Sequence, residues 1–165
     1  MKLHRSIPLF LLAAALLALS APFEASAWRG VQKWSYDAGN SVTGSPAAVN
    51  GTIVIGDSEG RLVALDKATG ELRWTFSAGG TINGTPALLG STLFTGGADG
   101  SLFAVDGATG REVWHFTPRE KYTPGAIWSS PAAGNGRVYF NSADGKVYAL
   151  DAPSGNLAWT FDTGR

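Results

Sequence analysis

The sequence predicts an all-β protein built from three repeats of about 40 residues, each forming four short antiparallel strands. One basis for this prediction is an eleven-residue pattern that occurs three times, with an aspartate eight residues before a tryptophan in each copy. A second basis is that glycine-containing turn signals divide each repeat into four runs of about four to six residues, the usual length of strands. The copies of the pattern are residues 64–74, 104–114 and 149–159.

The repeats follow one another at a nearly constant distance. Four tryptophans, at positions 34, 74, 114 and 159, are spaced 40, 40 and 45 residues apart. A Pro-Ala pair precedes each copy of the pattern, and the extra five residues of the last spacing fall between Trp114 and Pro131. The predicted units are residues 45–77, 85–117 and 130–162.

The turn signals and the apolar runs indicate how the strands of one unit pack. Pairs such as Asn50-Gly51 and Asp99-Gly100 favour the positive φ that two-residue hairpins require, so the strands of a unit are expected to meander antiparallel. The third strands, for example residues 62–65, are apolar on both faces and must be covered on both sides. Four-stranded units of this period, covered on both faces, are typical of stacked β-propeller blades. A single β-sandwich is the alternative, but it gives no reason for the constant Asp-to-Trp spacing.

One further segment resembles part of a blade. Residues 30–36 have the character of a fourth strand, with Trp34 in the place of Trp74. The predicted fold is therefore a partial β-propeller of three four-stranded antiparallel blades plus one extra N-terminal strand. Because closed propellers typically have four to eight blades, we expect an incomplete propeller. A truncated gene or sequence fragment accounts for this better than an obligate assembly of two chains.

The first residues read as an export signal. Lys2 and Arg5 precede an apolar run over residues 7–19, which is followed by the small residues Ala25 and Ala27 of a cleavage site. The run is shorter than the roughly 20 residues that a membrane span needs. We expect a signal peptide over residues 1–27 and a periplasmic or secreted protein over residues 28–165, without a transmembrane segment after cleavage. Cleavage after Ser20 is the alternative.

Composition excludes several classes of function. The chain has 13 basic and 13 acidic side chains, so it lacks the charge excess of a nucleic-acid-binding protein. It contains no cysteine, which excludes disulfides, thiolate metal sites and a lipid anchor on an N-terminal cysteine.

Catalytic and metal-ligating residues are not expected. His115 is the only histidine after residue 27, and strand alternation points it away from the neighbouring Trp114, towards solvent. Asp57, Asp99 and Asp144 recur at one turn, and we expect them to form the turn rather than to bind calcium.

The eleven-residue pattern resembles the tryptophan-docking motif, Ala-x-Asp-x-x-Thr-Gly-x-x-x-Trp, of the pyrroloquinoline-quinone (PQQ) repeat propellers. That family includes quinoprotein dehydrogenases and the propeller lipoprotein of the outer-membrane β-barrel assembly machinery. The commoner WD40-like repeat is disfavoured, since no tryptophan here is followed by aspartate. The resemblance implies that the indoles dock between neighbouring blades. The residues that it assigns to this structural docking motif are Asp66, Gly70, Trp74, Asp106, Gly110, Trp114, Asp151, Gly155 and Trp159.

The family's enzymes hold PQQ and calcium, and many place a bonded pair of adjacent cysteines against the cofactor. No residue of this chain can be matched to those ligands or to the catalytic aspartate, so we expect no cofactor. The predicted function is that of a non-enzymatic binding or scaffolding module, with a protein partner or small ligand that the sequence does not identify. The alternative is the N-terminal part of a PQQ-dependent quinoprotein dehydrogenase, which would hold PQQ and calcium. A saccharide-binding propeller is a third reading, based only on the aromatic content.

The insertion between the second and third units is the one irregular segment. It contains Arg119, Lys121, Tyr122 and Trp128, residue types that are enriched in binding surfaces. We consider it a candidate partner-binding loop. The alternative is a spacer whose Trp128 packs on a blade.

Overall fold

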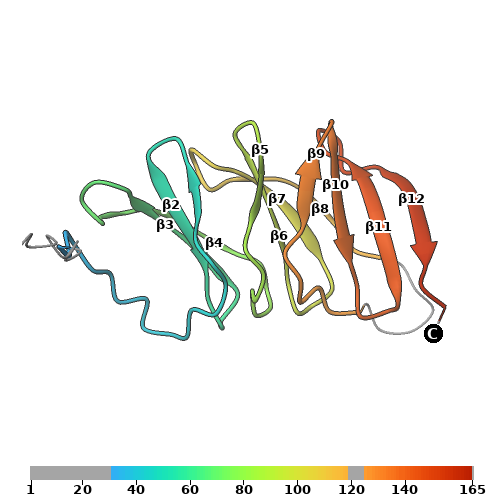
Figure 1. Cartoon of the computed structure of the whole chain (residues 1–165), viewed down its shortest axis with the longest axis horizontal. Coiled ribbons are helices and arrows are strands. Elements are labelled where there is room, and N and C mark those ends of the chain that lie inside the picture. The colour runs from blue at the N-terminus through green and yellow to red at the C-terminus, as the bar shows by residue number, and fades with distance from the viewer. Residues whose placement is uncertain (1–30, 119–124, 165) are drawn as a thin grey trace, which may run out of the picture. The chain divides into compact units, whose positions relative to one another are not determined.

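The computed structural model describes residues 31–118 and 125–164. The chain divides into one unit over Met1–Gln32, of which only two exposed residues are described, and a second unit over Lys33–Arg165 that holds every strand described. Figure 1 shows the strands of the second unit as successive sheets. The strands are β1 (Ala47–Val49), β2 (Thr52–Gly56), β3 (Arg61–Asp66), β4 (Leu72–Ser77), β5 (Ala87–Leu89), β6 (Thr92–Gly96), β7 (Leu102–Asp106), β8 (Glu112–Phe116), β9 (Ala132–Gly134), β10 (Arg137–Asn141), β11 (Lys146–Asp151) and β12 (Leu157–Asp162).

The predicted fold class is confirmed, because these strands form three separate four-stranded sheets in which neighbouring strands are antiparallel. Each sheet follows the chain order, as a meander of hairpins does. Both residues of the pair Asn50-Gly51 have positive φ, 44° and 75°, as a tight hairpin turn requires. In each sheet the register shifts once along the pairing of the third strand with the fourth. In the first sheet this shift falls between Ala64 and Leu65 of β3.

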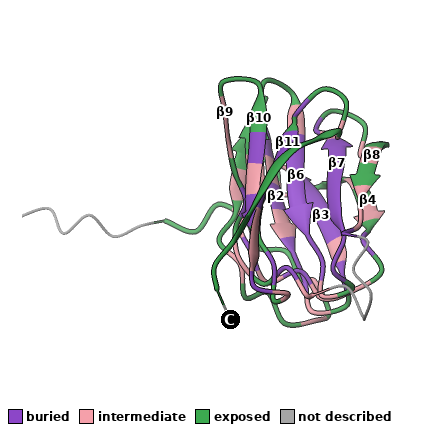
Figure 2. Ribbon diagram, turned by 90° about the vertical axis from the view of Figure 1, so that its right-hand side faces the viewer, coloured by how far each residue is buried: buried purple, intermediate pink, exposed green. Residues whose placement is uncertain are grey.

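The apolar core lies between neighbouring sheets. One cluster joins Leu62 and Val54 of the first sheet to Leu93 of the second, and another joins Phe94 of the second sheet to Leu150 of the third. Each fully buried side chain of this size contributes about 1.5–3 kcal/mol by leaving water. Figure 2 shows that the third strands β3 and β7 are buried along their length, while the fourth strands β4 and β8 are partly exposed. The sheets are therefore held together face to face.

The first strands of the three sheets lie next to one another, β1 beside β5 and β5 beside β9. Hydrogen bonds join the residues just before them: the Ser45 backbone N–H donates to the Thr85 hydroxyl at 3.2 Å, and the Thr85 N–H donates to the Ser130 hydroxyl at 2.8 Å. A Cβ on Gly84 would lie 2.5 Å from the Ser129 carbonyl oxygen, so backbone packs directly on backbone here. The sheets thus meet most closely along their first strands.

The expected strand at residues 30–36 differs from the structure. Residues 31–38 form no strand, because no other described strand pairs with them to make a ladder. Trp34 is nevertheless held in a defined place against the first sheet. The predicted signal peptide, residues 1–27, lies outside the described residues, and within the described part no helix is long and apolar enough to cross a membrane.

Candidate functional site

The tryptophans of the repeat pack on glycines of the following sheet. A Cβ added to Gly110 would lie 2.6 Å from Cδ2 of Trp74, so only glycine leaves room for the indole. Gly110 also has a φ of +72°, which side chains disfavour. Three contacts of this kind occur in the described residues: Trp34 on Gly70, Trp74 on Gly110, and Trp114 on Gly155.

Each of these indoles also makes a hydrogen bond. The acceptor is the backbone carbonyl three residues before the glycine, so the Trp74 N–H donates to the Gly107 carbonyl at 3.2 Å. The equivalent bonds run from Trp34 to Lys67 at 3.1 Å and from Trp114 to Ala152 at 3.0 Å. The bond and the glycine together fix the position of each ring, and for Trp74 and Trp114 they do so across the interface between two sheets.

The motif aspartates shape the turns that receive the indoles. Asp66 Oδ1 accepts the backbone N–H groups of Ala68 and Thr69 at 2.7 and 2.9 Å, and the Gly70 N–H donates to the Asp66 carbonyl at 2.8 Å. The Arg73 guanidinium, followed by these backbone donors, lowers the pKa of Asp66 to about 2. The equivalent Asp106 and Asp151 accept bonds from their own turns, and the Thr109 hydroxyl and N–H lower the pKa of Asp106.

Trp159 is the exception among the motif tryptophans. It is 42% exposed, and no glycine of the described residues lies against it. Its ring instead faces Tyr139 of the same sheet, at 6.0 Å between ring centroids. Phe161, two residues further on, is 62% exposed. The sequence grouped Trp159 with the other docking residues, but the structure places it on an uncovered sheet face.

The recurrent acidic residues are engaged in their own turns. Asp57 is buried and accepts the Arg61 backbone N–H and Nε–H, each at 2.8 Å, and this carboxylate raises the pKa of Arg61. The same guanidinium donates to the Ala38 carbonyl at 3.0 Å. Asp99 accepts the Ser101 N–H, and Asp144 accepts the Lys146 N–H. No group of three or more potential metal ligands occurs among the residues that the structure describes.

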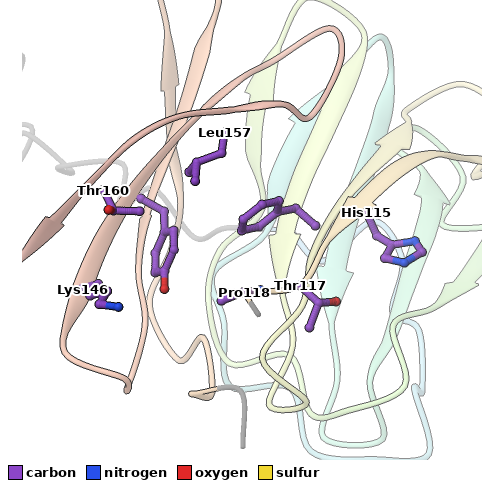
Figure 3. Close-up of a pocket in the computed structure, with 8 residues that line it drawn as sticks. His115, Thr117, Pro118, Lys146, Leu157 and Thr160 are labelled. Carbon is purple, nitrogen blue, oxygen red and sulfur yellow. The ribbon is translucent and has the colours of Figure 1, made fainter. Parts of the chain in front are cut away.

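An open cleft of about 780 Å³ lies between the second and third sheets. Its lining includes the rings of Phe116 and Tyr148, whose centroids are 6.0 Å apart, and Leu157. Figure 3 shows Lys146 and Thr160 on one side of this cleft. The figure places His115 at the far end from them. The residues that line the cleft are His115, Phe116, Thr117, Pro118, Lys146, Tyr148, Leu157 and Thr160.

His115 has the surroundings of a surface residue. Its side chain is 57% exposed, its Nδ1 lies 2.8 Å from Glu112 Oε1, and its ring centroid is 5.8 Å from that of Phe103. These contacts with Glu112 and Phe103 orient the ring.

The candidate partner-binding loop is only partly described. Arg119, Lys121 and Tyr122 lie outside the described residues, while Trp128 is 55% exposed. Ile127, directly before Trp128, is fully buried and packs on Gly96, where a Cβ would lie 2.1 Å from its Cγ2. The segment that leads to Trp128 is therefore anchored on the second sheet while the indole itself remains accessible.

Sequence reasoning missed two sets of contacts between sheets. The first is the hydroxyl acceptors Thr85 and Ser130, and the second is the packing of Ile82 on Gly56 and of Ile127 on Gly96. A signal for the first set was present, because a serine or threonine precedes the proline in all three Pro-Ala pairs.

Stacked four-stranded sheets joined by tryptophans on glycine turns define a β-propeller of the PQQ-repeat class. A family profile described as "Outer membrane protein assembly factor BamB" matches residues 17–164. The chain belongs to this family. A search among curated proteins finds no match.

Solved structures resemble the chain over most of its length. BamB from Moraxella catarrhalis is 27% identical with a TM-score of 0.68, and the match covers 80% of this chain and 43% of that protein. Quinohemoprotein alcohol dehydrogenase from Comamonas testosteroni is 27% identical with a TM-score of 0.64, and the match covers 74% of this chain and 21% of the enzyme. The computationally designed Ika4 protein, 21% identical with a TM-score of 0.63, shares the fold. The chain therefore spans less than half the length of these two natural proteins.

Proposed function

We propose that the chain works outside the cytoplasm as a non-enzymatic module that binds another polypeptide. The family profile and the similarity to the structure of an outer membrane protein assembly factor support this proposal. The predicted signal peptide over residues 1–27 supports export to the periplasm or beyond.

The main structural support for this proposal is the cleft beside β8. Its rings, from Phe116 and Tyr148, offer an apolar floor, and the exposed Leu157 lies at its rim. The Thr160 side chain adds a hydroxyl beside that floor, while the Thr117 hydroxyl lies 2.8 Å from the Ser101 hydroxyl. Such a combination suits an apolar side chain of a partner together with its flanking backbone. The exposed Trp128 is a second candidate contact for the same kind of partner.

The alternative function is that of a part of a PQQ-dependent dehydrogenase, favoured by the likeness to quinohemoprotein alcohol dehydrogenase. In the described segments, the acidic residues do not fit a site for PQQ and calcium. The carboxylates of Asp57, Asp99 and Asp144 are engaged in turn hydrogen bonds, and no described cluster of acidic residues could hold calcium.

Site-specific photo-crosslinking in the exporting cell tests the proposal. A photoreactive amino acid in place of Leu157, at the cleft rim, is expected to give a discrete adduct with one envelope protein. The matched control is the same amino acid in place of Val113, which is equally exposed but does not line the cleft. Thr160→Arg, which places a long cationic side chain on the cleft side of β12 beside Tyr148, is expected to abolish the Leu157 adduct. Equal adducts from both positions, or an adduct insensitive to Thr160→Arg, contradict the proposal.

A further inference from the structure

A second pocket, of about 490 Å³, lies between the segment before β1 and two turns of the first sheet. Three cationic residues line it, Lys33, Lys67 and Arg73, together with the acidic residue Asp66. The other lining residues are Gly51 and Ala68. Its volume falls within the roughly 300–1,000 Å³ of small-molecule sites. The pocket therefore has room for a small charged group and for part of the molecule that carries it.

The contact that positions Trp34 also brings the two lysines to the same pocket. The Lys67 carbonyl accepts the Trp34 indole N–H at 3.1 Å, and the Lys67 backbone N–H donates to the Gly51 carbonyl at 2.9 Å. Lys33 directly precedes Trp34 in the chain. Both lysines are exposed. Hydrogen bonds of the backbone and of the neighbouring indole thus place the two residues, while their ammonium groups stay in water.

Arg73 is held at the pocket by two side-chain partners. Its guanidinium donates to the Asp66 carboxylate at 2.5 Å and to the Thr52 hydroxyl at 3.1 Å. A guanidinium has five N–H donors in a rigid plane. These two bonds therefore orient Arg73 and leave further donors for a ligand.

The pocket keeps an excess of positive charge. Asp66 balances the guanidinium, and the charges of Lys33 and Lys67 remain. No ion pair joins either lysine to a carboxylate among the described residues. Glu71, the other carboxylate of this turn, accepts the Thr69 hydroxyl at 3.3 Å and does not line the pocket. Three cationic residues and one carboxylate thus leave two positive charges.

The repeat itself does not require these cations. Directly before the four repeat tryptophans the chain has, in order, Lys33, Arg73, Val113 and Ala158. Directly after the three motif aspartates it has Lys67, Gly107 and Ala152. The Trp114 indole makes the same hydrogen bond to the third sheet with Val113 and Ala152 at the two equivalent places. The docking contact therefore forms without any cation, and it does not account for the charges gathered at the first sheet.

We propose that this pocket binds a phosphate monoester, the dianionic group of a phosphorylated small molecule or of a lipid headgroup. Lys33 and Lys67 match its two negative charges, and Arg73 donates its remaining N–H groups to the phosphate oxygens. A carboxylate or a phosphodiester carries one charge and would leave one lysine unmatched. The inference goes beyond the proposed function, which concerns a polypeptide and the cleft between the second and third sheets.

Titration of the purified chain with inorganic phosphate, followed by NMR of the backbone amides at constant ionic strength, tests the proposal. We expect saturable shifts at Gly51 and Lys67. Lys33→Gln/Lys67→Gln is expected to bind phosphate at least ~10-fold more weakly, because it removes two charge-assisted hydrogen bonds. The matched control Arg111→Gln/Arg137→Gln removes two exposed cations that do not line the pocket, and it is expected to bind phosphate as the unaltered chain does.

An unchanged dissociation constant for the folded lysine variant overturns the proposal, and so does an equal loss in the arginine control. Circular dichroism establishes that both variants are folded, as their exposed positions lead us to expect. Acetate at the same ionic strength is expected to bind more weakly than phosphate. Equal affinity for the two anions overturns the choice of a dianion.

Two esters identify the source of the phosphate group. Glucose 6-phosphate represents a soluble ester, and phosphatidylcholine vesicles that contain phosphatidic acid represent a lipid. Binding to these vesicles that is absent with phosphatidylcholine alone, and absent in Lys33→Gln/Lys67→Gln, assigns the group to a lipid headgroup. Saturable binding of glucose 6-phosphate without binding to the vesicles assigns it to a soluble ester. A chain that binds neither ester overturns the proposal.

Discussion

The indole of Trp74 lies on the α-carbon of Gly110 in the following sheet, so closely that a methyl group on Gly110 would overlap the ring. The indole N–H donates to the Gly107 carbonyl of the same turn at 3.2 Å. This contact buries a large apolar ring and satisfies its polar atom at once. It recurs along the chain, and it joins sheets in a protein that has no cysteine to join them covalently.

Trp114 is expected to be among the most sensitive positions of the chain. Trp114→Ala leaves a cavity against Gly155 and Phe94 and is expected to cost about 3–5 kcal/mol of unfolding free energy. The neighbouring His115→Ala, a matched control on the same strand, is expected to cost no more than about 0.5 kcal/mol, since that side chain is largely exposed. Urea midpoints measure both, and comparable losses would mean that the strand faces are assigned backwards.

Gly96 is expected to tolerate no side chain. Gly96→Ala places a methyl group against the buried Ile127 and is expected to cost about 1–3 kcal/mol through overpacking. The matched control is Gly134→Ala, another strand glycine, around which nothing lies within 4 Å. Thermal unfolding of the two variants checks the difference. Equal melting temperatures would contradict the close packing of Ile127 on the second sheet.

The ion pair of Asp66 and Arg73 predicts a loss of stability in acid. The pKa of Asp66 in the folded chain is about 2, below the ordinary 3.8. The stability that ionised Asp66 contributes is therefore complete above about pH 4. That contribution is lost as the pH falls from about 4 to about 2. Arg73→Gln is expected to move the pKa of Asp66 upward, measured by NMR titration of the carboxyl carbon. An unchanged pKa in this variant would contradict the role of Arg73.

Export predicts a defined mature N-terminus. We expect cleavage between Ala27 and Trp28, because Ala25 and Ala27 supply the small side chains that a signal peptidase requires. N-terminal sequencing of the exported protein measures this. A mature chain that retains Lys2 would refute export by this signal.

The proposed function predicts no dehydrogenase activity. Purified chain with added PQQ and calcium is expected to show no dye-linked oxidation of primary alcohols or glucose. The carboxylates of Asp57, Asp99 and Asp144 are held in turns, and His115, the one histidine after residue 27, pairs with Glu112. Sustained PQQ-dependent turnover would favour the dehydrogenase alternative.

The sheets could be predicted because their signals are local. Asn50-Gly51 and the recurring aspartate turns set strand ends and register within one unit, and the constant Asp-to-Trp spacing repeats that register. Contacts between units were harder to predict, because they depend on how far apart the sheets pack. The Thr85 hydroxyl, which accepts a bond across that gap, looked like an ordinary residue before a proline.

The candidate site was predicted less well for the same reason. The cleft between Phe116 and Tyr148 exists only once two sheets are placed side by side, and neither residue carries a motif. Trp34 was expected to form a strand, yet a strand needs a paired neighbour as well as a suitable sequence. Its indole docks on Gly70 without one.

The hydrogen bonds from the Ser45 N–H to the Thr85 hydroxyl and from the Thr85 N–H to the Ser130 hydroxyl require only that the neighbouring unit has a hydroxyl at the same place. Neither of these hydrogen bonds depends on whether the neighbouring unit is the second or the third along the chain. An in-frame duplication of the coding sequence for one unit would therefore supply a blade that already matches both of its neighbours. By such duplications the number of blades can change by whole units, and every added blade still contacts its neighbours through the same hydrogen bonds.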